Sequence, residues 1–567
     1  MPSAAVFISL HYQNMTVKQS VSAAKHSSSP EVALRLVDIE KRLIRKNMFV
    51  EALGELMQVA SENLEDAQVW LLVGLVYTRM AHWQNAIGIL EAVLKLEPHN
   101  NQAKQLMSLA KFSIGQKEQA CQLIDLVCKS GSAIGPQWVL RAYLHAHTHK
   151  DPMHALAVAR DWGKRFADPL TRSATKIQVK DRNPRKILKI GYVTADFREH
   201  SVAFFMLPVL EHHNPQEVEV HVYSNGPSDK VTPTLKALVP HWHEVQELSD
   251  ESMHALIREH QIDVLVDLSG YTHGHRLGVF ARRAAPVQVT WLGYMHTLGM
   301  KAIDYRLVDA SIAPPSHAAY YSEKLFQLTC MASYAPPLYS PLCEEPPMLR
   351  KGYPTLVSLN SSGKITDAML HVWAKILHAR EDARLIIMVK EDSADAAQAH
   401  MQPRVEAAGM PLDRVSVMHQ QPLNQFMEMG YIADLALDTS PISGGTTTLH
   451  ALWMGLHVIT LDAERGVDAS SARILQGLGM AHCIAENEEA YVERVLAFLN
   501  RPDGLKKWRM LGRERMQASS LMNYAARNAE LEKAYRLMWL NWLSGQCKTL
   551  SATDDVDTYL AEMDPVA

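Results

Sequence analysis

The sequence predicts an α-helical repeat domain followed by two α/β domains, each built on a parallel sheet. Three observations support this prediction. Alanine recurs at a spacing of 34 residues, at Ala52, Ala86 and Ala120, which is typical of repeated helix pairs. From Ile187 onward, short apolar runs alternate with helical segments, as in units of strand, helix and strand. A proline-rich segment interrupts this alternation, which then resumes, so two similar domains follow the repeats.

The composition excludes several classes of protein. A chain of 567 residues is too long for one core and predicts about three or four domains. Lys and Arg number 57 against 61 Asp and Glu, so no basic excess favours a nucleic-acid partner. The six cysteines form no CxxC pair, which argues against a zinc site and against a disulfide framework. No apolar run has membrane length, and the run at 4–10 has no basic residues ahead of it, as a signal peptide would, so we expect a soluble cytoplasmic protein.

Residues 33–168, after a flexible leader at 1–32, are predicted to form helical repeats of the tetratricopeptide type. The positions that match such a repeat are Trp70, Gly74, Tyr77, Ala86, Leu90 and Pro98. Trp138 follows Trp70 by two periods and Ala155 comes one residue late, so we expect about four units. Stacked units form a curved solenoid whose concave side can hold an extended peptide. The alternative is that the repeats only brace the next domain, and they could also join two chains in a homodimer.

The first α/β domain is predicted at residues 187–335, after a polar linker at 169–186. Its apolar runs are ILKIGYVTADF, VEVHVYS, QIDVLVDLSGYTHG and PVQVTWLGY. Strands that alternate with helices in this way form a Rossmann-like parallel sheet, and ligands bind at the carboxyl ends of such strands. His200 follows the first strand and the loop at 269–275 follows a later one, so both are expected at that edge.

The second α/β domain is predicted at residues 351–520, after a proline-rich hinge at 336–350. The long amphipathic helix at 521–545 is expected to pack back across both domains, and residues 546–567 are expected to be a flexible tail. Two Rossmann-like domains with a cleft between them are the GT-B architecture of nucleotide-sugar transferases.

The segment at 433–460 is the strongest candidate for a binding site. A short strand at 435–437 leads through a turn to a helix at 446–455, and Gly444 and Gly445 allow the chain to turn tightly. Thr446 and Thr447 stand in the first helical turn, where unpaired N–H groups, the helix dipole and the hydroxyls favour an anion. The segment therefore predicts a phosphate site, although a glycine turn capped for stability alone would have the same sequence.

Several motifs together resemble the O-GlcNAc transferase and SPINDLY family, glycosyltransferase family 41. They are KIGYVTADFREHSVAFFMLPVLEHH, APVQVTWLGY, the lysine of SLNSSGKIT, and LDTSPISGGTTTLHALWMG. The resemblance extends from about residue 67 to 542, and EHSVAFF and GGTTT are closer to the SPINDLY members. It implies an inverting transfer of a sugar from a nucleotide diphosphate to Ser or Thr of a protein, with no metal and no cofactor besides the sugar donor.

The resemblance also implies roles for individual residues. Lys364 matches the lysine that binds the diphosphate, and Thr446 and Thr447 match the phosphate-binding threonines. His200 matches a histidine beside the reacting sugar, where an imidazole could relay the proton of the acceptor or hydrogen-bond the donor. His200 and Lys364 are therefore the candidate catalytic residues.

The remaining candidates would bind the donor. Asn360 and Ser361 begin the loop of Lys364 and could touch the sugar or the phosphate. Phe426 could stack on the base, although a phenylalanine on a helix is more often part of the core. His450 stands where relatives carry an acidic residue that accepts ribose hydroxyls, and a neutral imidazole accepts only one such bond. Gly444 and Gly445 complete the donor set, and Gly445 replaces a histidine of animal O-GlcNAc transferases.

Two classes of function remain open at this point. The first is a protein O-glycosyltransferase that uses UDP-GlcNAc, with GDP-fucose or UDP-glucose as alternative donors. The second is a catalytically silent adaptor whose repeats hold a partner. His450 and the unusual turn at Met295 and His296 favour the adaptor, whereas Lys364, Thr446 and Thr447 favour the enzyme.

Overall fold

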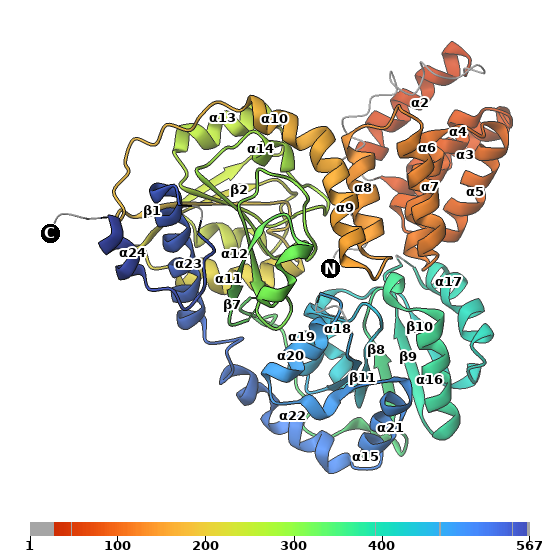
Figure 1. Cartoon of the computed structure of the whole chain (residues 1–567). Coiled ribbons are helices and arrows are strands. Elements are labelled where there is room, and N and C mark those ends of the chain that lie inside the picture. Colours follow the sequence, from red (N-terminus) through yellow and green to blue (C-terminus); the bar gives the residue numbers. More distant parts are fainter. Residues whose placement is uncertain are drawn as a thin grey trace.

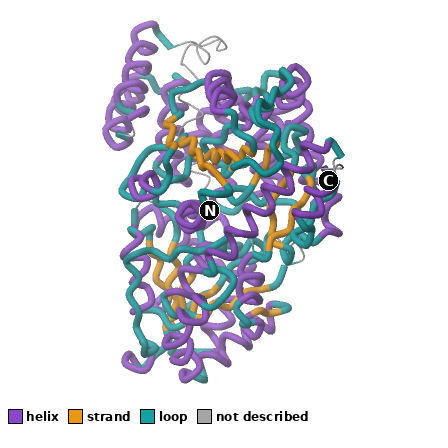
Figure 2. Tube along the Cα trace, turned by 90° about the vertical axis from the view of Figure 1, so that its left-hand side faces the viewer, coloured by secondary structure: helices purple, strands orange, loops and turns teal. Residues whose placement is uncertain are grey.

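The computed structural model describes residues 28–46, 48–330, 332–391, 393–463, 467–546 and 548–563. Figure 1 shows helical repeats at the upper right and two α/β lobes, the N-lobe (187–335) at the upper left and the C-lobe (347–517) below. In both views, helices surround the strands (Figure 2). The predicted fold class, a helical repeat domain followed by a GT-B pair of Rossmann-like domains, is confirmed. Most of the predicted leader, residues 1–27, lies outside the described part of the chain.

Four helix pairs form the repeats. They are α2 (Pro30–Arg42) with α3 (Phe49–Glu62), α4 (Ala67–Arg79) with α5 (Trp83–Leu96), α6 (Asn101–Ser113) with α7 (Lys117–Lys129), and α8 (Gly135–Ala146) with α9 (Pro152–Trp162). Ala52, Ala86 and Ala120 stand in the second helix of successive pairs and are fully buried. The period of 34 residues thus marks the position at which neighbouring helices approach most closely.

The N-lobe contains a seven-stranded parallel sheet of order β3-β2-β1-β4-β5-β6-β7. Its strands are β1 (Leu188–Thr194), β2 (Val218–Ser224), β3 (His241–Glu244), β4 (Val264–Asp267), β5 (Val287–Thr290), β6 (Tyr305–Asp309) and β7 (Lys324–Leu328). Its helices are α11 (Ser201–His212), α12 (Thr232–Ala237), α13 (Asp250–His260), α14 (Leu277–Ala281) and the short η4 (Pro315–Tyr320). The strand order reverses beside β1, between β1 and β4, which opens a crevice at the carboxyl end of β1.

The C-lobe contains a six-stranded parallel sheet of order β10-β9-β8-β11-β12-β13. Its strands are β8 (Thr355–Ser358), β9 (Arg384–Met388), β10 (Val415–Met418), β11 (Leu435–Leu437), β12 (His457–Leu461) and β13 (Ile484–Ala485). Its helical segments are α15 (Pro347–Lys351), η5 (Ser362–Lys364), α16 (Asp367–Ala379), α17 (Ala394–Ala407), η6 (Leu412–Arg414), α18 (Leu423–Met427), η7 (Glu428–Tyr431), α19 (Thr446–Trp453), α20 (Ser470–Gly477), η8 (Ala481–Cys483), α21 (Glu488–Leu499) and α22 (Pro502–Gln517). The order reverses between β8 and β11, so this lobe also has a crevice at its centre.

The chain returns to the N-lobe through α23 (Tyr524–Ser544), shown in dark blue at the left of Figure 1. Asn528 Nδ2 donates to the Val209 carbonyl at 2.8 Å, so α23 is tied to α11. The prediction of a flexible tail at 546–567 is wrong for α24 (Val556–Met563), because its Leu560 is 5% exposed and belongs to the main core. The predicted linker also begins as a helix, α10 (Asp168–Ser173), where Thr171 Oγ1 donates to the Ala281 carbonyl at 2.9 Å.

The repeats pack against both lobes. At the N-lobe, a Cβ built on Gly163 would lie 2.1 Å from the Gly299 carbonyl oxygen, so the two backbones are in direct contact. At the C-lobe, a Cβ on Gly363 of η5 would meet the Ser113 carbonyl of α6 at 3.5 Å. The repeats therefore brace the loop that carries Lys364. Among the helices that the structure describes, none is both long and apolar enough to cross a membrane.

Candidate functional site

The predicted site residues follow the strands at the two crevices. His200 precedes α11, which follows β1, while Lys364 ends η5, which follows β8. Gly444 to Thr447 connect β11 with α19. Because parallel strands all end at the same edge of a sheet, the two C-lobe segments lie side by side and face the N-lobe.

Asp438 organises the turn between β11 and α19. Its Oδ1 accepts hydrogen bonds from the Gly444 N–H at 2.8 Å and from Asn360 Nδ2 at 2.9 Å. Its Oδ2 accepts from Thr460 Oγ1 at 2.7 Å. The carboxyl group is almost fully buried and bonds to three separate segments of the C-lobe. It therefore fixes the glycine turn against the loop that begins at Asn360.

Lys364 is held at this turn by its ammonium group. Lys364 Nζ donates to the Ser443 carbonyl at 2.6 Å, one residue before Gly444. Burial lowers the pKa of Lys364, and the carboxylates of Asp438 and Asp468 oppose that shift. An ammonium group has three N–H donors, and Ser443 uses one of them. The other donors could bind an anion beside the start of α19. Lys364 is thus hydrogen-bonded to the residue that precedes the glycine turn.

The two glycines have different surroundings. A Cβ on Gly444 would lie 2.4 Å from Thr448 Oγ1, so glycine is needed for the turn to pack on α19. A Cβ on Gly445, the residue before α19, would meet nothing within 4 Å, so the space in front of it is open. The start of α19, with its first unpaired N–H groups, thus faces a gap that a ligand can enter.

The other C-lobe candidates hold the start of α19 in place. Thr447 Oγ1 donates to Asn360 Oδ1 at 3.0 Å, which ties the first turn of α19 to the loop after β8. Thr446 is buried, and the Ser361 carbonyl accepts from the Lys364 N–H at 2.9 Å. Asn360 and Ser361 therefore shape the loop of Lys364, and Asn360 joins that loop to both Asp438 and Thr447.

His200 caps α11 in the N-lobe. Its Nδ1 accepts the Val202 N–H at 3.2 Å, which assigns the remaining ring hydrogen of a neutral imidazole to Nε2. Nε2 is buried and has no hydrogen-bond partner among the residues that the structure describes. Burial lowers the pKa of His200 well below its usual value, and Arg198 and Lys390 add to that shift. The imidazole is therefore neutral near pH 7 and presents an N–H donor.

The two lobes meet at the helices that carry these groups. Phe204 lies one turn after His200 in α11, and its ring is 4.9 Å from that of His450 in α19. The Ala335 N–H also donates to the Phe204 carbonyl at 2.8 Å, which joins the hinge to α11. Lys390, which follows β9 of the C-lobe, is close enough to lower the pKa of His200. The structure therefore packs α11 against α19, and His200 precedes this contact between the lobes by one helical turn.

His450 is enclosed by aromatic residues. Tyr334 OH lies 2.7 Å from His450 Nδ1, and the Phe426 ring lies 6.0 Å from the imidazole. Burial lowers the pKa of His450 to about 3, so the ring is neutral. Phe426 itself is half-buried and packs against the main core. Both readings of Phe426, core residue and stacking platform, remain compatible with this position.

The unusual turn near Met295 faces the repeats. The His296 ring is 5.0 Å from His147, and Tyr294 is 6.0 Å from Tyr143 of α8. Arg306 Nη1 donates to the Tyr294 carbonyl at 2.8 Å and holds the turn from within the N-lobe. The departure from the family pattern is thus part of the contact between the repeats and the N-lobe.

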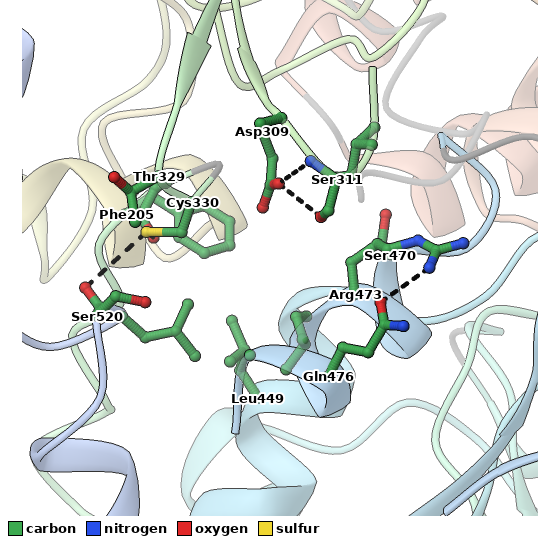
Figure 3. A pocket seen from close by; sticks show the side chains of 16 residues that line it. Phe205, Asp309, Ser311, Thr329, Cys330, Leu449, Ser470, Arg473, Gln476 and Ser520 are labelled. Carbon is green, nitrogen blue, oxygen red and sulfur yellow. Dashed lines mark hydrogen bonds between the residues drawn. The ribbon is translucent and has the colours of Figure 1, made fainter. Parts of the chain in front are cut away.

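A separate cavity of about 270 Å³ lies between the lobes (Figure 3). Residues from both lobes line it, including Asp309 and Cys330 at the ends of β6 and β7 and Arg473 on α20. Leu449 of α19 reaches this cavity, whereas the ten predicted site residues do not line it. The candidate site therefore consists of the hydrogen-bonded groups around Lys364 and is separate from this cavity.

Sequence reasoning missed the buried carboxylates that hold the site. Neither Asp438 nor Asp196 is among the residues predicted for the site. Asp196 Oδ1 lies 3.7 Å from His200 Nδ1 and 3.6 Å from Arg198 Nη2, and burial raises the pKa of Asp196 to about 6. Asp438 directly follows β11, Asp196 comes two residues after the end of β1, and Asp267 is the last residue of β4. An aspartate at the carboxyl end of a buried strand was the signal available.

Comparisons with known proteins agree with this geometry. The model described as "Glycosyl transferase family 41" matches residues 169–332 and 355–531. Arabidopsis thaliana SPINDLY, named a probable UDP-N-acetylglucosamine–peptide N-acetylglucosaminyltransferase, is 33% identical over 399 residues, which cover 69% of this chain and 43% of that protein. The Solanum lycopersicum protein of the same name is 34% identical over 401 residues, covering 69% and 42%. The chain thus spans less than half the length of these curated relatives.

A solved structure covers more of the molecule. A mutant of Thermobaculum terrenum O-GlcNAc transferase matches with a TM-score of 0.82 and 28% identity, over 92% of this chain and 100% of that one. The match includes the repeats as well as both lobes, since it covers more than the family model does. Since the family model matches more than half of the chain, across both Rossmann-like lobes, this chain belongs to glycosyltransferase family 41.

Proposed function

We propose that this chain transfers N-acetylglucosamine from UDP-GlcNAc to Ser or Thr hydroxyls of proteins. One observation carries the proposal. The buried ammonium of Lys364 is fixed on the Ser443 carbonyl beside the open start of α19, and these groups together form a site for the diphosphate of a nucleotide sugar. The donor and the peptide acceptor are those in the names of the SPINDLY relatives.

The diphosphate is the leaving group, and its developing charge must be stabilised in the transition state. In this proposal the Lys364 ammonium and the N–H groups at the start of α19 supply that stabilisation. The hydrogen bond of 3.0 Å between Thr447 and Asn360 holds the start of α19 against the loop that carries Lys364. A protein cation placed at the diphosphate performs the task that a divalent cation performs in other transferases, so we propose transfer without a metal.

His200 would position the sugar rather than accept the proton of the acceptor hydroxyl. Its Nδ1 lone pair is used by the Val202 N–H, so Nε2 carries the hydrogen and acts as a donor. Its lowered pKa also disfavours proton uptake near pH 7. The acceptor oxygen would attack the anomeric carbon from the side opposite the diphosphate, which inverts the configuration there. The bond from this carbon to the diphosphate oxygen breaks, UDP leaves, and the hydroxyl proton passes to solvent water.

The acceptor is proposed to reach the gap from the repeats. These pack on the N-lobe at Gly299 and on the C-lobe at Gly363, so their position relative to the gap is fixed. A peptide held along the concave side of the solenoid would be presented at a constant distance from His200 and Lys364.

A second candidate function is a silent adaptor, and His450 is the observation that favours it. Its Nδ1 is already hydrogen-bonded to Tyr334 OH at 2.7 Å, so His450 has fewer acceptor positions for ribose hydroxyls than a carboxylate would have. Thermal unfolding with millimolar UDP, GDP, UDP-GlcNAc or GDP-fucose distinguishes the two functions, because a ligand of the native state raises Tm by mass action. The transferase predicts a rise with the UDP compounds. A rise in Tm with the GDP compounds alone would indicate GDP-fucose as the donor in place of UDP-GlcNAc. No rise in Tm with any of the four compounds would favour the adaptor.

Incubation of the full chain with UDP-GlcNAc and a Ser/Thr peptide library tests the transfer itself. Mass spectrometry separates an added N-acetylhexosamine from a hexose or a deoxyhexose. The proposal expects the first of these on Ser or Thr. Transfer of only one of the other two sugars, each offered as its nucleotide donor, would contradict the choice of GlcNAc.

A further inference from the structure

Histidines gather on one face of the N-lobe sheet, at the edge remote from β7. The edge strand β3 lies next to β2, and the pairing sets His241 beside His221 and His243 beside Tyr223. Alternate residues of a strand share a face, so these side chains project together. His260, the last residue of α13, covers the same face, with its ring 4.4 Å from that of His243.

Three of these histidines have the spacing of metal ligands. One ring nitrogen each from His221, His243 and His260 lies within 4.8 Å of the others. His221 Nδ1 and His243 Nε2 are 3.4 Å apart, which is long for a hydrogen bond. Two nitrogens that bind one tetrahedral zinc ion at about 2.0–2.1 Å are separated by about 3.3–3.4 Å, so this pair already has the required spacing.

The outer nitrogens of the same rings are held by neighbouring groups. His221 Nε2 lies 2.9 Å from Glu219 Oε1, and His260 Nδ1 lies 2.8 Å from Tyr223 OH. Histidines that bind metals usually make such a bond through the nitrogen that does not bind the ion, because it fixes the tautomer and the ring orientation. Because these two bonds use the outer nitrogens, His221 Nδ1 and His260 Nε2 are the nitrogens that could bind an ion inside the cluster.

The protonation states also suit a metal. Burial lowers the pKa of both His221 and His243 to about 4, and it lowers the pKa of His260 as well. The three rings are therefore neutral at pH 7, and a neutral imidazole is the form that binds a metal. Lys189 lies 3.4 Å from Glu219 and so neutralises part of the negative charge beside the cluster.

We propose that His221, His243 and His260 bind one divalent transition-metal ion, with zinc as the best fit and a fourth position open to water. Imidazole nitrogens suit zinc, copper and nickel, and three histidines with one open position form a common tetrahedral set. His221 is buried, whereas His243 and His260 are half-exposed, so an ion can enter from the solvent side. The bound ion would fasten the edge strand β3 to the end of α13.

The cysteine spacing gave no sign of a zinc site, and no metal was expected. The ligands of the proposed site come from three elements that are adjacent only after the sheet forms. A second group in the repeats, Cys121 with His145 and His149, also has ligand atoms within 4.8 Å. It fits a metal less well, because both nitrogens of His145 are already engaged, at 2.9 Å by His154 and at 3.2 Å by Asp125.

The experiment uses the full chain without a histidine tag, stripped with a chelator and titrated with Co²⁺ and Zn²⁺. We expect one Co²⁺ per chain, a visible absorption band of a low-coordinate ion, its displacement by Zn²⁺, and a rise of Tm with Zn²⁺. His243→Gln and His260→Gln should each weaken binding at least about 100-fold and abolish the Tm rise. Glu219→Gln should weaken binding about 10–100-fold, as the loss of an outer hydrogen bond to a ligand does.

Three matched variants assign the site. His99→Gln changes an exposed histidine of the repeats and should bind the ion as the wild type does. Cys121→Ser removes the thiol of the second group and should leave the stoichiometry at one. His241→Gln changes a histidine whose Nε2 is 3.5 Å from Glu219 and which is not one of the three ligands, so it should change affinity less than about threefold.

Several outcomes would overturn the proposal. The first is absence of Co²⁺ and Zn²⁺ binding to the wild type at about 100 µM, well above the affinity range of zinc sites. The second is binding that Cys121→Ser abolishes and His243→Gln preserves, and the third is binding that depends on His241 but not on His260. If His243→Gln does not fold, His260→Gln at the end of α13 gives the same readout.

Discussion

Replacement of Lys364 by methionine tests the diphosphate site most directly. Methionine keeps the length of the side chain and removes the charge. If the ammonium stabilises the departing diphosphate, its loss should lower kcat by about 10²–10³-fold, or roughly 3–4 kcal/mol, the usual effect of one preorganised donor. The change in KM should be smaller, because the charge on the diphosphate grows in the transition state.

The same substitution should not destabilise the chain. Nζ makes one hydrogen bond, 2.6 Å to the Ser443 carbonyl, and its loss costs about 1 kcal/mol. Burial lowers the pKa of Lys364, which means that the folded protein disfavours the charged form. The penalty for the buried charge is present below the pKa of Lys364 in the folded protein and disappears above its pKa in the unfolded chain. The methionine variant avoids this penalty at pH 7. Tm should therefore stay the same or rise.

The assay compares initial rates of sugar transfer to a peptide library for three chains: wild type, Lys364→Met and Lys375→Met. Lys375 is an exposed lysine on α16 of the same lobe, so its substitution should change neither rate nor Tm. A Lys364→Met rate within threefold of the wild type, with an unchanged Tm, would refute the role assigned to the ammonium. A parallel fall in rate and Tm would instead show that Lys364 is structural.

Three further predictions concern groups around Lys364 and around His200. Gly444→Ala would place a Cβ 2.4 Å from Thr448 Oγ1, so chemical denaturation should show a loss of about 1–3 kcal/mol. Thr447→Val removes the bond to Asn360 Oδ1, and UDP titration should show about tenfold weaker binding with a Tm loss of only a few degrees. Burial raises the pKa of Asp196 to about 6 from 3.8, so its folded carboxyl keeps a proton that the unfolded one loses. The contribution of Asp196 to stability is complete below pH 4 and is lost as pH rises through 6. Between pH 4 and 7, Asp196→Asn should therefore gain stability relative to the wild type, by at most about 3 kcal/mol. Denaturant unfolding at each pH measures this difference. Equal pH profiles for the two proteins, an unweakened UDP titration of Thr447→Val, or an unchanged free energy of unfolding for Gly444→Ala would contradict the respective arguments.

Local patterns were sufficient for most of the fold. The strand at 435–437 and the start of α19 at Thr446 were predicted at the observed residues, because an apolar run, paired glycines and a threonine-rich helix start are all local signals. The spacing of 34 residues located the helix pairs, since one small residue is needed at each close helix contact. The tail was misjudged because α24 is stabilised by packing on α23, and its own sequence carries only a weak helical signal.

The sequence by itself determined the order of helices and strands and the glycine turn before α19, since each depends on residues close together in the chain. The choice of Lys364 came from the resemblance of its motif to the family. Only the tertiary structure decided what those residues touch. Asp438 bonds to the segments at Asn360 and Thr460, and Tyr334 engages His450 from more than a hundred residues away. Side-chain chemistry fixes what a residue can bind, whereas burial and long-range contacts fix its charge, its tautomer and its partners.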